Sequence, residues 1–152
     1  MHEICIMRAF TIIVCIAVIV VTSCTEKEPA IVLPTVSKTI QFQVGRGRDY
    51  SLPVYQGWKA NVVLTISRES FADGKSAIVW DTTFHYRSMQ DFPEIADPFV
   101  IRKTIDGVVE SKETIRVSRV LSFINTEQQR SQSASGETIP SGTKFSLFTV
   151  EL

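Results

Sequence analysis

The sequence predicts an all-β domain, an antiparallel β-sandwich of immunoglobulin-like type, behind an apolar N-terminal segment. Two observations lead to this prediction. After residue 38, hydrophobic and polar side chains alternate with a period of two along several short stretches, and turn residues separate these stretches. No stretch of 11 or more residues after residue 24 has the 3.6-residue period of an amphipathic helix. A small β-barrel would show the same spacing and is the alternative architecture.

Each expected strand follows from its own pattern. The first, residues 39–44, places Ile40, Phe42 and Val44 on one face and polar side chains on the other. A return strand is expected next, and then a long strand, which places Trp58 on its apolar face. The expected strands after the first are residues 50–55, 58–67, 77–80 and 82–87 (one bent strand or two), 99–105, 108–111, 114–124 and 144–152.

Turns and loops are expected where Gly, Asp and Pro gather. Asp73-Gly74 predicts a tight turn at residues 72–75, because Asp-Gly favours positive φ angles. Asp106-Gly107 predicts a hairpin between residues 99–105 and 108–111. Residues 91–98 form an acidic, proline-containing loop. Residues 125–142 are almost entirely polar and predict a long, solvated, flexible loop.

The N-terminal segment carries the most specific motif in the chain. An apolar run extends from Phe10 to Val21, interrupted only by Thr11. Val21 also begins the tetrapeptide Val21-Thr22-Ser23-Cys24. This tetrapeptide resembles the lipobox of bacterial lipoproteins, in which an aliphatic residue precedes the cysteine by three positions and small residues lie between them. The resemblance implies cleavage between Ser23 and Cys24 and attachment of lipid to the Cys24 sulfur.

The length of the apolar run agrees with a cleaved signal peptide. The run has 12 residues, whereas a signal peptide needs roughly 7–15 and a membrane-spanning helix about 20. Arg8 supplies the positive charge that precedes such a run, although Glu3 offsets it. Translation from Met7 instead of Met1 would give a more conventional start. An uncleaved N-terminal anchor helix is the alternative.

The motif divides the chain into three parts. Residues 1–23 form the signal peptide, residues 24–37 a lipidated tether containing Pro29 and Pro34, and residues 38–152 the β-sandwich domain. The charged residues directly after Cys24 are similar to the export signal of Bacteroidota surface lipoproteins. The resemblance implies a lipid anchor in the outer membrane, with the domain exposed at the cell surface rather than facing the periplasm.

The net charge and the cysteine content limit the partners and the kind of stabilisation that the domain is expected to have. The first 23 residues contain one acidic and one basic residue, so the remaining 129 residues keep the zero net charge of the whole chain. This balance gives no reason to expect binding to nucleic acid. The domain after Cys24 contains no cysteine, so its stability must come from packing rather than from disulfides.

The residues that could carry chemistry do not form a recognisable catalytic motif. His85 lies between two aromatic residues of an expected strand. At such a position we expect an imidazole exposed at the surface, without a catalytic role. Asp91, Glu94 and Asp97 could offer oxygen ligands to Ca²⁺, but their spacing lacks the pattern of an EF-hand loop. They are retained as a candidate binding loop. Thr82 follows Asp81 in a triplet that matches the Bacteroidota O-glycosylation pattern. No metal and no cofactor are predicted.

Aromatic and basic residues supply two further candidate sites. Arg46 and Arg48 flank Gly47 and could grip an anion, although a charged turn is the simpler interpretation. Six aromatic residues could line a sugar-binding face or belong to the core. They are Tyr50, Tyr55, Trp58, Trp80, Phe84 and Tyr86.

These observations favour a lipid-anchored binding or assembly module of the cell envelope. It would act as a subunit of a surface complex, an adhesive or ligand-capturing module, or an accessory of a secretion or transfer machine, with a protein partner in the envelope. The competing class is an envelope hydrolase with an unrecognised active site, and a third is a purely structural envelope protein.

Processing at Cys24 gives the first testable prediction. The purified protein should begin at Cys24 and carry acyl mass in intact-mass spectrometry, because the lipobox ends at this residue. Cys24→Ala should abolish lipid attachment and release the chain from the membrane fraction. An intact Met1 or Met7 at the N-terminus, or unchanged fractionation of Cys24→Ala, would contradict the prediction.

Overall fold

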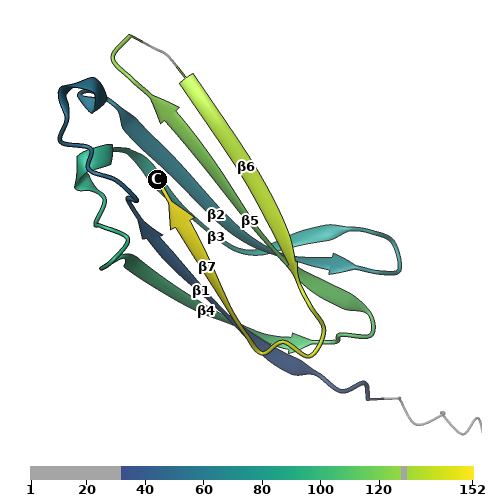
Figure 1. Ribbon diagram of the computed structural model, residues 1–152. Helices are drawn as coiled ribbons and strands as arrows, with labels where there is room; N and C mark the ends of the chain where they lie inside the picture. The colour runs from purple at the N-terminus through teal and green to yellow at the C-terminus, as the bar shows by residue number, and fades with distance from the viewer. Residues whose placement is uncertain (1–31, 128–129) are drawn as a thin grey trace, which may run out of the picture. The chain divides into compact units, whose positions relative to one another are not determined.

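Seven strands form two sheets that pack against each other, as Figure 1 shows. The structure is a computed structural model that describes residues 32–127 and 130–152. The predicted signal-peptide helix and Cys24 lie outside the described residues. No helix within the described residues is long and apolar enough to cross a bilayer. The strands are β1 (Val36–Gly45), β2 (Lys59–Ser70), β3 (Ser76–Ser88), β4 (Phe99–Val108), β5 (Glu113–Ile124), β6 (Arg130–Ile139) and β7 (Phe145–Glu151).

The two sheets have the strand orders β4-β1-β7 and β3-β2-β5-β6. The all-β sandwich predicted from the sequence is therefore confirmed, and its immunoglobulin-like type stays a prediction. One strand pair departs from the antiparallel arrangement, because β1 and β7 pair in parallel. Parallel neighbours require a long connection between them, and here β2 to β6 all intervene in the chain.

The core forms where the apolar faces of the two sheets meet. The register aligns β1 with β4 and β7, and Ile40, Phe42 and Val44 of β1 are fully buried. The opposite sheet contributes Ala60, Val62, Leu64 and Ile66 from β2, also fully buried. The period-two pattern thus identified both core faces correctly. The hairpin at residues 72–75 is confirmed as well, and Gly74 adopts the positive φ, 65°, that the turn requires.

The expected strand at residues 50–55 does not form. The chain leaves β1 at Gly45 and crosses to the other sheet through a loop that contains the 3₁₀ helix η1 (Pro53–Tyr55). Proline is tolerated in the first turn of such a helix, because N–H groups there have no intrahelical partner. The aromatic residues of this segment had suggested a strand, but here they belong to a crossing loop.

The predicted hairpin at Asp106-Gly107 is also wrong. β4 continues through both residues and pairs with β1 on either side of them, with Val36 opposite Val108 and Lys38 opposite Ile105. This register leaves one extra residue in β4, a β-bulge, and Gly107 adopts a φ of 69° within it. A bulge uses positive φ as a hairpin turn does, so the two are indistinguishable from the dipeptide.

The long polar segment is largely a strand rather than the predicted flexible loop. Within residues 125–142, β6 pairs with β5 without a register shift. All of its residues except Ile139 are exposed. An edge strand with both faces in solvent needs no hydrophobic alternation, which explains why the sequence pattern missed it. Residues 77–87, by contrast, are confirmed as one strand with irregular pairing to β2.

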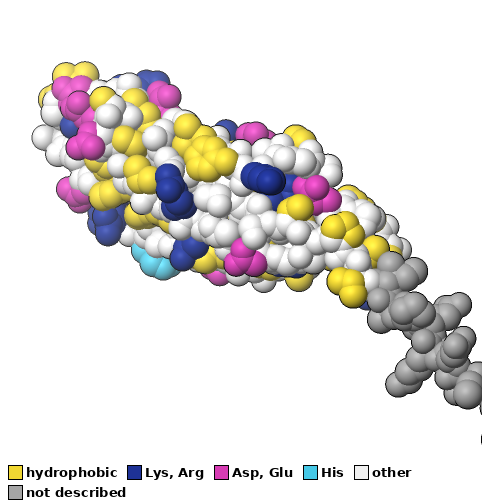
Figure 2. All heavy atoms as spheres, turned by 90° about the horizontal axis from the view of Figure 1, so that it is seen from below, with side chains coloured by type: hydrophobic (Ala, Val, Ile, Leu, Met, Phe, Trp, Pro, Cys, Tyr) yellow, Lys and Arg dark blue, Asp and Glu magenta, His cyan; other side chains and the backbone are white. Residues whose placement is uncertain are grey.

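One side of the sandwich is closed by aromatic rings and cations between β3 and β4. The Phe84 and Phe99 rings stack at 5.9 Å, and the Arg87 guanidinium lies over both. Lys103 lies over the Trp80 ring at 5.4 Å in the same manner. Such contacts shield rings that the core does not fully bury. Figure 2 shows one face of the molecule, where Lys and Arg side chains lie among the exposed hydrophobic ones.

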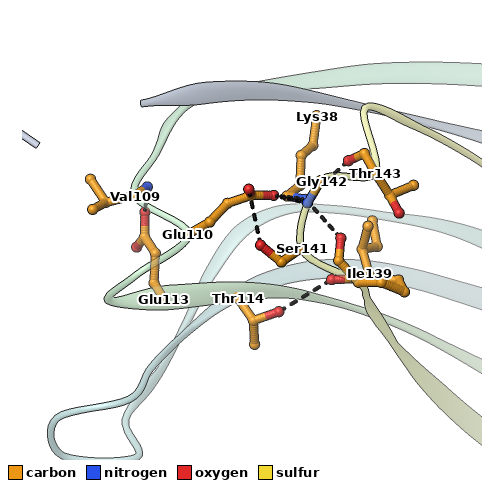
Figure 3. A network of polar contacts seen from close by, with 10 residues as sticks. Lys38, Val109, Glu110, Glu113, Thr114, Ile139, Ser141, Gly142 and Thr143 are labelled. Atoms are coloured by element: carbon orange, nitrogen blue, oxygen red, sulfur yellow. Dashed lines mark hydrogen bonds and ion pairs between the residues drawn. The ribbon is translucent and has the colours of Figure 1, made fainter. Parts of the chain in front are cut away.

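Lys38 closes the end of the sandwich at which β1 begins. Its side chain is 2% exposed, and its Nζ donates to the carbonyls of Pro140 and Thr143, each at 3.0 Å. The same Nζ lies 2.5 Å from Glu110 Oε1. Figure 3 shows how the Glu110 carboxylate also accepts the Ser141 hydroxyl. One buried ammonium therefore joins β1 to the β4–β5 turn and to the β6–β7 turn, satisfying the requirement that a buried charge be paired.

The Lys38 network predicts a stability change at acidic pH. Hydrogen bonds from Lys38, the Gly142 N–H and the Ser141 hydroxyl lower the pKa of Glu110 from the ordinary value of 4.5. The native state therefore binds this proton less readily than the unfolded chain. The stabilisation is complete above pH 4.5 and is lost as the pH falls through the lower native pKa.

Glu110→Gln should lower the stability at neutral pH and flatten its decline below pH 4.5. Denaturant unfolding at several pH values measures both effects. The matched control is Glu69→Gln, which removes a carboxylate from the surface ion pair with Arg116 and should change stability less. Equal effects of the two substitutions would contradict the special role of Glu110.

Candidate functional site

Two crossing loops meet at the end of the sandwich opposite Lys38. Residues 46–58 connect β1 to β2, and residues 89–98 connect β3 to β4. The Arg46 N–H donates to the Pro93 carbonyl, and the Ile95 N–H donates to the Arg46 carbonyl. A third bond runs from the Met89 N–H to the Trp58 carbonyl. Backbone hydrogen bonds thus fix one loop against the other, and they position the side chains that both loops carry.

A mostly apolar pocket of about 340 Å³ lies at this end of the molecule. The first crossing loop supplies most of its wall, η2 (Met89–Asp91) supplies one residue, and the adjoining ends of β5 and β6 complete it. Its size is in the range of small-ligand sites, which combine apolar walls with a few polar groups. The lining residues are Arg48, Tyr50, Val54, Tyr55, Trp58, Met89, Phe123 and Ser131.

The aromatic rings of the pocket hold one another in place. The Tyr50 and Tyr55 rings meet edge to face at 4.8 Å, an arrangement that aromatic pairs favour. Tyr50 is almost fully buried, and its carbonyl accepts the Gln90 side-chain amide at 2.9 Å. Trp58 is half-buried against the core. The pocket therefore has a fixed floor, whereas Val54 at its rim is 69% exposed.

Two ionisable groups of the pocket have shifted pKa values. Burial raises the pKa of the Tyr50 phenol, which keeps it protonated to higher pH than a free tyrosine. The Tyr55 hydroxyl, with the nearby Tyr50, raises the pKa of the exposed Arg48 guanidinium. Arg48 is therefore a permanent cation at the edge of an aromatic wall. This arrangement can hold an apolar or aromatic group and attract a polar or anionic one beside it.

Arg46 and Arg48, the two arginines considered as an anion grip, face different neighbours. Arg46 faces carboxylates, with Nη2 at 3.2 Å from Glu94 and Nη1 at 4.0 Å from Asp49. Arg48 lies instead beside Tyr55 in the aromatic pocket. The two arginines line a shallow hollow together, but the cation of Arg46 is already matched by acidic neighbours. Arg48 is the arginine that the pocket can use.

The acidic candidate loop lies outside the aromatic pocket. Asp91 ends η2, and the Glu94 carboxylate pairs with Arg46. The Asp97 N–H donates to the Glu94 carbonyl, so these two residues belong to one turn. All three acidic side chains are exposed. Within the part of the chain that the structure describes, no group of three or more His, Cys, Asp or Glu residues could hold a metal ion.

Thr82 and His85 both lie on the edge strand β3. Thr82 pairs with Leu64, so it shares the core-directed face of the sheet with Trp80 and is only half exposed. O-glycosylation at Thr82 stays a prediction. His85 is exposed, as expected for a surface imidazole, and it does not line the aromatic pocket.

The structure brings together half of the aromatic residues singled out from the sequence. Tyr50, Tyr55 and Trp58 share the pocket, whereas the other three belong to β3. Sequence reasoning missed four lining residues, namely Val54, Met89, Phe123 and Ser131. Phe123 had a detectable signal, because it continues the apolar face of the expected strand at residues 114–124. For the others, spatial proximity depends on the crossing loops and has no sequence signature.

Comparisons with known proteins returned no match to this chain, whether to a protein-family model, a curated protein or a solved structure.

Trp58→Ala tests the structural part of the pocket. The substitution should lower the free energy of unfolding by about 3 kcal/mol, the lower end of the range for a large aromatic residue, because the ring is only half-buried. Val54→Ala, at the exposed rim, should change it little. Denaturant unfolding measures both. A negligible effect of Trp58→Ala would place its ring outside the packed structure.

Proposed function

We propose that this chain is a lipid-anchored binding module of the cell envelope, held in the outer membrane through lipid on Cys24 and exposed at the cell surface. The lipobox and the charged residues that follow it support the anchor and its location. The aromatic pocket is the observation that supports binding. Its rings are fixed by loop hydrogen bonds while its rim is exposed, so the site is largely preformed.

The position of the pocket suits a tethered receptor. β1 begins at one end of the sandwich, and the loops that join β1 to β2 and β3 to β4 lie at the other end (Figure 1). The residues of these loops supply most of the pocket. A tether that joins the domain through β1 leaves this pocket on the side away from the attachment point.

The chemistry of the pocket favours capture over hydrolysis. Among the residues that the structure describes, those lining the pocket include one cation, Arg48, and no carboxylate or imidazole. A hydrolase needs such groups within reach of the bound substrate. The pocket instead fits an apolar or aromatic side chain of an envelope partner protein, with Arg48 meeting a carboxylate or carbonyl beside it.

Tryptophan fluorescence can test ligand capture directly. Trp58 and Trp80 are the two tryptophans of the chain, so Trp80→Phe leaves Trp58 as the reporter inside the pocket. Peptides that carry an exposed aromatic residue next to a carboxylate should change its emission in a saturable manner. In a parallel titration, glycan fragments replace the peptides and the same emission is measured.

Val54→Arg should abolish this signal, because it places a bulky cation at the pocket rim. The matched control is Ile78→Arg on β3, since Ile78 is 68% exposed, as Val54 is 69% exposed, but does not line the pocket. Saturable binding that survives Val54→Arg would contradict this site. Binding of glycans alone would replace the peptide partner with a carbohydrate.

A further inference from the structure

The edges of a β-sheet can recruit further strands, and most edges of this sandwich are obstructed. β3 has two register shifts against β2, and Tyr86 within it adopts a φ of 33°. Bulges of this kind twist an edge away from a regular partner. The edge of β7 is obstructed by a side chain, because Arg119 Nη1 donates to the Thr149 carbonyl at 2.7 Å.

The edge of β4 is obstructed near its end. It contains the bulge at Asp106-Gly107, and the Arg68 guanidinium donates to the carbonyls of both residues. Its exposed face also carries Arg102, which donates two hydrogen bonds to Gln41. A further strand would meet an irregular backbone at this edge.

β6 differs from the other three edges. Its pairing with β5 is continuous from Ile124–Arg130 to Ile115–Ile139. Residues 130–138 are all exposed, and none is Pro or Lys. Charged side chains, Pro and bulges are the usual protections of an edge strand. β6 has no bulge and no Pro, and its two charged residues, Arg130 and Glu137, lie near its ends, so its central residues offer a regular template for pairing. In an antiparallel ladder every second residue of β6 directs its backbone groups away from β5.

We propose that β6 pairs with β6 of a second copy of this chain, antiparallel and around a twofold axis at Ala134. A twofold axis perpendicular to the sheet places side chains of the same face opposite each other. Even-numbered residues of one copy therefore pair with even-numbered residues of the other, and odd-numbered residues with odd-numbered ones. Ala134 is the centre of the exposed residues 130–138, and an axis at this residue gives each of them a partner within the same range of the second copy. The two four-stranded sheets then form one continuous sheet.

This register makes β6 self-complementary. Ser133 meets Ser135, and Gln132 meets Gly136, so small side chains dominate the seam. The two charged residues of the strand are Arg130 and Glu137. Arg130 meets Thr138, and Glu137 meets Ser131, whose hydroxyl can donate to the carboxylate. No like charges are opposed, which favours a second copy as the occupant of this edge.

Disulfide trapping tests both the pairing and its register. In the proposed dimer the Cα atoms of residue 134 lie about 4.5–5.5 Å apart across the axis, a distance that a disulfide can span. Ala134→Cys in the full chain should give a reducible dimer on mild oxidation in membranes. Gln132→Cys should not, because four residues of offset separate its two copies by about 13 Å. The wild-type chain, with its three native cysteines, sets the background.

A second pair of variants tests the dimer without oxidation. Ala134→Lys places two like charges at the axis and should weaken dimerisation of the purified chain several-fold in sedimentation experiments. Ala134→Gln should leave it unchanged, and both variants should keep the wild-type melting temperature because residue 134 is exposed. A chain that stays monomeric, equal trapping at residues 132 and 134, or trapping to a different protein would overturn the proposal.

Discussion

The arrangement of the two sheets depends most on the contacts that the Lys38 ammonium makes. It lies at the start of β1, almost without solvent contact, and three oxygens surround it. Those oxygens belong to two turns, residues 109–112 and 140–144, and each turn carries the chain from one sheet to the other. A buried cation is costly unless it is fully paired. Movement of either turn would leave the ammonium incompletely paired and would raise the free energy of the folded state. The contacts of Lys38 therefore hold the two sheets in place at this end.

The opposite end of the sandwich has a different construction. There the crossing loops are longer, and backbone hydrogen bonds and the Arg46–Glu94 ion pair hold them together. The resulting surface is a pocket of rings with Arg48 at its edge. Loops fixed on a rigid scaffold are where proteins usually carry binding residues. The two ends of the domain are therefore built differently, with a charged clamp at one end and an aromatic pocket at the other.

The amino-acid pattern predicts the core strands well and the connections poorly. Burial of Ile40, Phe42 and Leu64 follows from period-two alternation, because the side that faces the other sheet must be apolar. β6 escaped prediction because a strand exposed on both faces leaves no such pattern. Asp106-Gly107 was assigned to a hairpin because bulges and turns use the same backbone conformation. The pocket combines residues far apart in sequence, and of those only Arg48 and the aromatic residues of the first loop are candidates that the sequence alone indicates.

Hydrogen exchange in Lys38→Met tests the structural claim most directly. The substitution keeps the length of the side chain and removes its charge, so both turns lose their common partner. The amides of Lys112 and Gly142, which donate to Val109 and to Glu110, should exchange faster by a similar factor. The amide of Gly74, in the β2–β3 turn, should change far less. Unchanged protection in both turns, or loss in only one of them, would contradict the account.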